Sequence, residues 1–102
     1  MKKKVYICAP YAGTGDIEEN IERAKEIARM LHKNGFVPVV PHIAAGFLSE
    51  EKEREQILEY CMELLDGCDH LYIDMERGIT AGMLAEIKHA EQKKINGGRI
   101  CL

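Results

Sequence analysis

The sequence predicts an α/β domain of the flavodoxin-like or Rossmann-like class, a three-layer sandwich around a parallel sheet. Short apolar runs alternate with amphipathic helical patterns along the whole chain, which is typical of βαβ units. The first run, residues 5–9 (VYICA), is continuously apolar, as in a central strand buried on both faces. Right-handed crossovers then favour a four-stranded sheet in the order 2-1-3-4.

Length and composition limit the protein further. At 102 residues the chain has room for one domain, residues 1–102, with a single core. The net charge of -3 provides no basic surface for DNA or RNA, so no nucleic acid polymer is expected as a partner. No apolar run approaches the ~20 residues of a membrane span, and no signal-peptide core follows the N-terminus. We therefore expect a cytoplasmic protein with no membrane partner.

The cysteines do not indicate a metal site. The four of them, Cys8, Cys61, Cys68 and Cys101, lack the Cys-x-x-Cys pairing that zinc sites use. Two fall in predicted strands, where a small hydrophobic residue is expected, so reduced core thiols are the preferred interpretation. No cluster of His, Cys and Asp has the spacing of metal ligands, and neither a metal nor another cofactor is expected.

The first helix follows the loop that begins at Pro10. Asp16, with Glu19 three positions later, forms a capping-box-like start, and Gly35 marks the end of the helix. The apolar residues step by four and three, which predicts one buried stripe made of Ile17, Ile21, Ala24, Ala28 and Leu31.

The middle of the chain predicts an edge strand, a loop and a second helix. The strand covers residues 36–40 (FVPVV), and Pro38 places it at an edge because proline cannot donate to a ladder. Residues 41–48 are apolar but aperiodic, which predicts a loop that forms a pocket wall. Ser49 is expected to cap the second helix. The buried face of that helix is predicted to consist of Ile57, Leu58, Cys61, Leu64 and Leu65.

The last third of the chain predicts a strand, a helix and a final strand. Residues 70–73 form the third strand, and residues 99–102 the fourth. The third helix, which residues 96–98 (NGG) break, is expected to pack on the sheet through Met83, Leu84, Ile87 and Ala90.

This topology predicts where a ligand binds. Open parallel sheets bind ligands beyond the carboxyl ends of their strands, at the point where the direction of winding reverses. Winding reverses between the first and third strands, so the crevice lies between the loop after Ala9 and the loop after Ile73. We expect the ligand between residues 10–16 and residues 74–82, with His42 at the rim.

Glu86 is the residue we predict to carry the chemistry. A Glu on an amphipathic helix ordinarily faces solvent, but here Gly82 lies four residues earlier and lets a ligand approach closely. The Glu86 side chain leans toward the helix N-terminus, where the positive end of the dipole would keep the carboxylate ionised. A held, ionised carboxylate is what nucleophilic attack at a sugar anomeric carbon requires.

Three further candidates each have two interpretations. Asp74, at the end of the third strand, either caps a loop or joins the site, where it or Glu76 would protonate the leaving base. His42 after Pro41 is either a loop anchor or a hydrogen-bond partner of the substrate. Residues 13–16 (GTGD) form either a turn before a capped helix or a phosphate site made of backbone N–H groups. They match neither the dinucleotide fingerprint nor the P-loop.

Four segments resemble a known family: residues 4–13 (KVYICAPYAG), 20–42 (NIERAKEIARMLHKNGFVPVVPH), 64–74 (LLDGCDHLYID) and 78–90 (GITAGMLAEIKHA). They are similar to short phage and bacterial members of the nucleoside 2-deoxyribosyltransferase-like superfamily, and also to deoxynucleoside monophosphate N-glycosidases. The most specific part is Gly82-Met83-x-x-Glu86-Ile87-x-x-Ala90, which resembles the Gly-x-x-x-Glu-Leu-Gly-x-Ala helix of the superfamily.

The resemblance implies an enzyme that acts on the N-glycosidic bond of a nucleoside or nucleotide, with Glu86 as the nucleophile that forms a covalent deoxyribosyl intermediate. It also implies a homodimer or larger homo-oligomer, since neighbouring subunits often complete the active sites of the family. The resemblance and the positions of the loops together predict these substrate-binding residues: Tyr6, Ala9, Pro10, Tyr11, Gly13, Asp16, His42, Gly78, Gly82 and Met83.

The chain departs from the pattern of the active transferases at two positions. Thr80 stands where they carry an Asp, and Cys61 where they carry an acid that contacts the sugar. These departures favour a second function class, a non-catalytic module that binds or sequesters a nucleotide. The retained Glu86 helix favours the enzyme.

Overall fold

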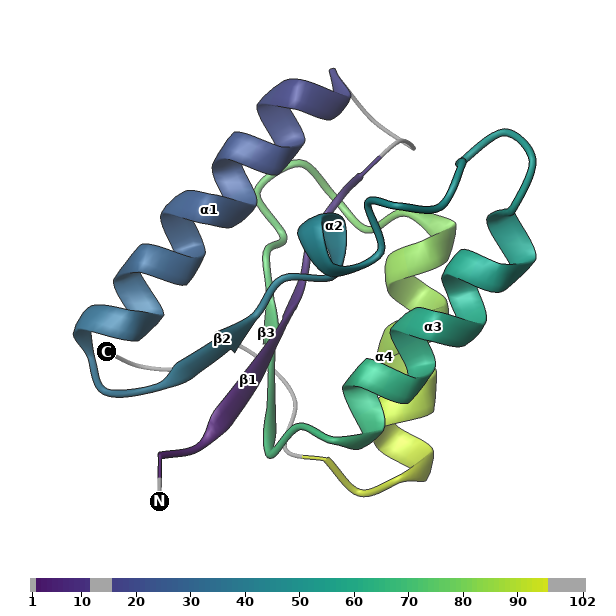
Figure 1. Cartoon of the computed structure of the whole chain (residues 1–102). Coiled ribbons are helices and arrows are strands. Elements are labelled where there is room, and N and C mark those ends of the chain that lie inside the picture. The colour runs from purple at the N-terminus through teal and green to yellow at the C-terminus, as the bar shows by residue number, and fades with distance from the viewer. Residues whose placement is uncertain (1, 12–15, 96–102) are drawn as a thin grey trace.

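The computed structural model describes residues 2–11 and 16–95 (Figure 1). Within these residues a parallel sheet of three strands in the order β2-β1-β3 is combined with four helices. The elements are β1 (Lys4–Cys8), α1 (Ile17–Lys33), β2 (Val37–Val39), α2 (Pro41–Ala44), α3 (Arg54–Asp66), β3 (His70–Ile73) and α4 (Ala81–Gln92). The predicted α/β class and parallel sheet are confirmed, whereas the predicted fourth strand, residues 99–102, lies outside the described residues.

Strand β1 is the centre of the sheet and of the core. It pairs with both neighbours, so that Val5 lies opposite Pro38 on one side and His70 on the other. Residues 5–8 have no solvent exposure, which explains why the run is apolar on both faces. Strand β2 is at an edge of the described sheet, as Pro38 predicted.

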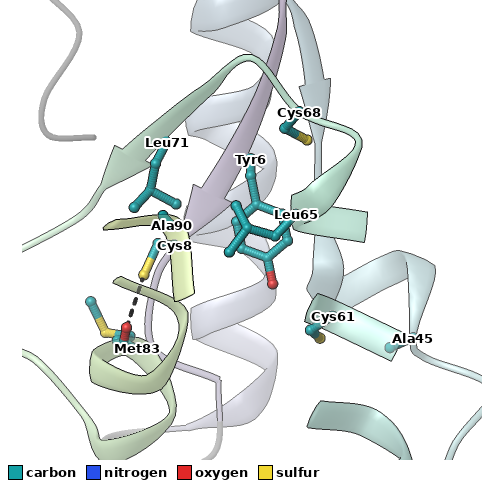
Figure 2. Close-up of a cluster of buried hydrophobic side chains, with 9 residues drawn as sticks. All are labelled: Tyr6, Cys8, Ala45, Cys61, Leu65, Cys68, Leu71, Met83 and Ala90. Carbon is teal, nitrogen blue, oxygen red and sulfur yellow. Dashed lines mark hydrogen bonds between the residues drawn. The ribbon is translucent and has the colours of Figure 1, made fainter. Parts of the chain in front are cut away.

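The two faces of the sheet have separate cores. Helix α1 covers one face, and α3 and α4 cover the other (Figure 1). Alternate residues of β1 point to opposite faces. On the α1 face the buried cluster consists of Val5, Ile7, Ala9, Ala24, Ile27, Leu31 and Tyr72. The cluster on the other face, shown in Figure 2, consists of Tyr6, Cys8, Ala45, Cys61, Leu65, Cys68, Leu71, Met83 and Ala90.

The ends of helix α1 follow the prediction, but its buried stripe is rotated. The Asp16 side chain caps the helix by accepting from the Glu18 amide at 3.0 Å, and Gly35 follows the helix with a φ of +89°. The buried residues are Asn20, Ala24, Ile27 and Leu31. Ile17, predicted to be buried, is 38% exposed, and the polar Asn20 is buried instead.

Two predictions about the middle of the chain are wrong. Residues 41–44 form the short helix α2 and not a loop, because Pro41 fits a first helical position, where no amide donor is needed. Helix α3 begins at Arg54 and not at Ser49. The Ser49 amide donates to the Glu53 carboxylate at 2.9 Å, so this segment turns once more before the helix starts.

Helices α3 and α4 pack on the sheet largely as predicted. Cys61 and Leu65 are buried on α3, and Met83 and Ala90 on α4, but Leu84 is 45% exposed, contrary to prediction. The predicted core thiols Cys8, Cys61 and Cys68 are buried and free, while Cys101 lies outside the described residues. Across residues 2–11 and 16–95, no helix has both the length and the apolar character to cross a membrane.

Candidate functional site

A cavity of about 460 Å³ opens beyond the carboxyl ends of the strands. Its walls come from the residues after β1, from α2, from α3 with the segment before it, and from the β3–α4 loop with the first turns of α4. The lining residues are Ala9, Tyr11, Pro41, His42, Ala45, Glu50, Arg54, Ile57, Leu58, Cys61, residues 77–83 and Glu86. This is the end of the sheet at which the strand order predicts a crevice.

Glu86 lines this cavity and is held by two side chains of β1. The residue is 8% exposed. Its carboxylate accepts a hydrogen bond from the Tyr6 phenol, and the Cys8 thiol donates to Oε1 at 3.5 Å. Tyr6 and Cys8 are two apart on one strand, so both point to the face that α4 covers. The strand therefore fixes the position of a carboxylate that belongs to a helix.

The electrostatics of Glu86 differ from the prediction. Burial raises its pKa to about 7 from an ordinary value of 4.5, against the lowering effect of the bonds from Tyr6 and Cys8. Near neutral pH the group therefore exists in both protonation states. The expectation that the dipole of α4 keeps it ionised is wrong. Glu86 lies beyond the first turn, where the dipole has lost most of its effect.

The two donors to Glu86 remain protonated. The pKa of the Tyr6 phenol is raised by burial and by the neighbouring Glu86 charge, and the same two causes raise the pKa of the Cys8 thiol. Cys61 also lines the cavity, and burial raises the pKa of its thiol to about 11. These three groups therefore act as neutral hydrogen-bonding groups and not as anionic nucleophiles at neutral pH.

His42 is both an anchor and a part of the cavity wall. Its Nε2 lies 2.9 Å from the Pro10 carbonyl, which can only accept, so Nε2 carries the proton and Nδ1 is the acceptor. Burial lowers the pKa of His42, which favours the neutral ring. The Tyr11 ring packs edge-on against it at 5.5 Å. Nδ1 is buried with no hydrogen-bond partner among the described residues.

Five other predicted positions line the cavity: Ala9, Tyr11, Gly78, Gly82 and Met83. Gly78 has a φ of +86°, a left-handed conformation that favours glycine. A Cβ atom on Gly82 would meet only the Thr80 hydroxyl, at 3.9 Å, so this stretch of wall has free space above it. Thr80 caps α4 by accepting from the Met83 amide.

Other predicted site residues do not reach the cavity. Asp74 is buried, but it pairs with Arg23 of α1 at 3.2 Å, and the exposed Glu76 pairs with the same arginine at 2.8 Å. Neither carboxylate lines the cavity, so neither stands as the proton donor that we predicted. Pro10 contributes its carbonyl to His42, and Asp16 serves as the cap of α1. Gly13 lies outside the described residues.

Charged residues that no sequence pattern marks also line the cavity. Glu50 and Arg54 line the cavity and form an ion pair with each other. Four residues apart, they have the spacing of an ordinary surface pair, so no sequence signal marks them. Arg77 also lines the cavity, from the β3–α4 loop, and donates to the side chain of Asn20 at 2.8 Å. No group of three or more His, Cys, Asp or Glu side chains in the described part of the chain has an arrangement that could hold a metal ion.

Comparison with known proteins identifies a family. Residues 3–99 match the model of the family described as Domain of unknown function (DUF7768), and the chain belongs to that family. None of the curated proteins matches the sequence.

Proposed function

We propose that this DUF7768 domain acts on the N-glycosidic bond of a deoxynucleoside or its monophosphate, as a 2-deoxyribosyltransferase or an N-glycosidase. The observation that supports this most strongly is the position of Glu86, a buried carboxylate at a cavity wall, oriented by Tyr6 and Cys8. The cavity, at about 460 Å³, is within the usual size range of small-molecule sites. The resemblance of the 82–90 segment to the nucleophile helix of the superfamily supports the same proposal.

The proposed reaction has two steps. The ionised Glu86 carboxylate attacks the anomeric carbon, the bond from that carbon to the base nitrogen breaks, and its electron pair leaves with the base, which takes up a proton. The glycosyl ester on Glu86 is then resolved by water or by the nitrogen of a second base, which restores the carboxylate. Tyr6 and Cys8 hold the carboxylate oxygens in place through both steps.

Glu50 is our candidate for the base that accepts a proton from the attacking water or second base in the second step. Among the described residues it is the carboxylate besides Glu86 that lines the cavity, and Arg54 pairs with it. Asp74 and Glu76 are excluded from direct transfer in this geometry because both are turned toward Arg23 on α1. In this proposal the leaving base therefore takes its proton from solvent water, and Glu50 acts only as a base.

The second candidate function is a non-catalytic module that binds a nucleotide. It is favoured by Cys61 and Thr80, which line the cavity where the similar transferases carry acidic residues. Neither a neutral thiol nor a hydroxyl can supply the charge of those carboxylates. The same cavity would then hold the ligand without turnover.

One experiment separates the two functions. The protein is incubated with a panel of deoxynucleosides and their monophosphates, and free base is measured by chromatography. The enzyme releases base, and replacing Glu86 by Gln lowers the rate by much more than tenfold. A rate loss below tenfold, which is only ~1.4 kcal/mol of barrier, would show that Glu86 is not the nucleophile. Thermal stabilisation by a panel member without release of base supports the binding module.

We further propose that the protein is a cytoplasmic homo-oligomer. We also propose that its sheet has four strands in the flavodoxin-like order 2-1-3-4. Large apolar side chains are exposed on the elements that surround the cavity: Ile43, Phe47, Ile79 and Leu84. Such side chains are typical of an interface between subunits. Size-exclusion chromatography with light scattering tests this, and a monomer at micromolar concentration contradicts it.

A further inference from the structure

Arg77 brings a positive charge to the cavity that no carboxylate of the described residues pairs with. It lines the wall from the β3–α4 loop, and its guanidinium donates to the Asn20 side-chain oxygen at 2.8 Å. The other cavity arginine, Arg54, is paired with Glu50. Arg23, on the same helix as Asn20, is paired with carboxylates as well. Arg77 is thus held by a neutral amide, whereas the nearby Arg23 and Arg54 have anionic partners.

Asn20 connects the two loops on either side of the predicted crevice. It is 3% exposed, in the buried stripe of α1, where the helical pattern calls for an apolar residue. Its Nδ2 donates to the Tyr11 carbonyl at 2.7 Å, while its Oδ1 accepts from Arg77. A carboxylate of the same size at this position would neutralise Arg77. The amide instead orients the guanidinium and leaves its charge available.

The loop that carries Arg77 is also fixed at its start. Arg23, one turn after Asn20 on α1, contacts Asp74 at 3.2 Å and Glu76 at 2.8 Å. Three residues of this loop are therefore held on a single face of a long helix. A charged group that is oriented before binding loses less conformational entropy when a ligand arrives.

We infer that Arg77 recognises an anionic substituent of the ligand, and that Asn20 is the positioning residue that holds its guanidinium toward the cavity. The inference rests on the proposed function for one point only, that the anion is the phosphate monoester of a deoxynucleotide. An arginine fork matches two phosphate oxygens, and charge-assisted bonds of this kind are stronger than neutral ones. The cavity therefore selects deoxynucleoside monophosphates over deoxynucleosides.

The test uses probes that have no base, so that binding does not depend on turnover. Calorimetry compares 2-deoxyribose 5-phosphate, 2-deoxyribose and inorganic phosphate on the wild-type protein. We expect the sugar phosphate to bind at least about tenfold more tightly than the sugar, with the difference falling as salt is raised. Inorganic phosphate bound as tightly as the sugar phosphate would mean that the cavity recognises only a free anion, which overturns the nucleotide part of the inference.

Variants assign the effect to the two residues. Arg77→Gln should remove most of the tenfold preference and leave the affinity for 2-deoxyribose unchanged, whereas Arg77→Lys should keep part of it. Arg29→Gln, which removes an exposed arginine on α1 away from the cavity, is the matched control and should have no effect. A preference that survives in Arg77→Gln overturns the inference.

Asn20→Asp separates positioning from a purely structural role. The new carboxylate would neutralise Arg77, so only the phosphorylated probe should bind more weakly. Equal weakening of both sugar probes in a folded Asn20→Asp protein would contradict positioning. If this variant does not fold, Arg77→Gln still decides whether the cation recognises the anion. If the preference for the sugar phosphate depends on Arg77 but no nucleotide is turned over, the inference holds and the proposed enzyme is refuted. If nucleotides are turned over but Arg77→Gln keeps the preference, the enzyme holds and the inference is refuted.

Discussion

Replacing Glu86 by Gln should stabilise the protein at alkaline pH. In the folded protein burial raises the pKa of this carboxyl group to about 7, whereas an unfolded chain has the ordinary value of 4.5. Between these two values the folded state binds more protons than the unfolded state, so stability falls as pH rises. The full contribution of the proton is present below pH 4.5 and is lost above pH 7.

The size of the effect follows from the same two values. Each pKa unit corresponds to about 1.4 kcal/mol, so the total loss is about 3.5 kcal/mol, of which roughly 2–3 kcal/mol falls between pH 5 and pH 8. Glutamine has nearly the same shape, has no proton to lose in this range, and still offers an oxygen to the Tyr6 phenol. The stability of Glu86→Gln relative to wild type should therefore rise by roughly 2–3 kcal/mol from pH 5 to pH 8.

Urea denaturation of both proteins at the two pH values measures this difference. Other titrating groups contribute equally to both proteins and cancel. Glu63→Gln, which removes an exposed carboxylate on α3, is the control and should follow the wild type. Parallel loss of stability in wild type and Glu86→Gln between pH 5 and pH 8 would refute the assignment of a buried, titrating carboxylate at this position.

Three other changes test neighbouring contacts. Tyr6→Phe removes a hydrogen bond that lowers the pKa of Glu86. Because such bonds contribute roughly 1.5–3 kcal/mol, the midpoint of the pH dependence above should move upward by about one to two pH units. Arg23→Ala leaves Asp74 buried without its cation and should cost about 2 kcal/mol by urea denaturation, less than a fully buried pair because Arg23 is 36% exposed. Asp74→Asn in the same protein should restore part of that loss. Leu65→Ala opens a cavity at a fully buried position of α3 and should cost about 2–5 kcal/mol without changing ligand selectivity.

Much of the fold was predictable because its signals are local. The continuous apolar run of β1, the Asp16 cap and Gly35 each determine one element by short-range physics. The errors occurred where tertiary contacts decide. Ser49 has the composition of a helix cap, yet the Glu53 carboxylate accepts from its amide and the helix starts later. A sequence pattern contains no information about that competing bond.

The position of the cavity was predictable, but the side chains that surround it were not. Strand order and loop composition predict a crevice at the end of the sheet where the cavity lies, and the helical motif selects Glu86, which lines that cavity. Which acids accompany it depends on side-chain direction. Asp74 directly follows β3, but its carboxylate pairs with Arg23 on α1 and does not line the cavity. Asn20 was not selected at all, since a polar residue on a helix is read as exposed until the neighbouring elements are known.

The burial of Glu86 is itself an argument for a functional role. A carboxylate whose pKa is raised to about 7 lowers the stability of the folded protein at neutral pH by about 3 kcal/mol relative to a group that does not titrate. An apolar residue or a glutamine on α4 would fill the same space beside Tyr6 without this loss. The hydrogen bonds from Tyr6 and Cys8 do not remove the loss, but they keep the group in one orientation against the cavity. A group that reduces stability and is nevertheless held in a fixed orientation is typical of sites where proton or charge transfer takes place.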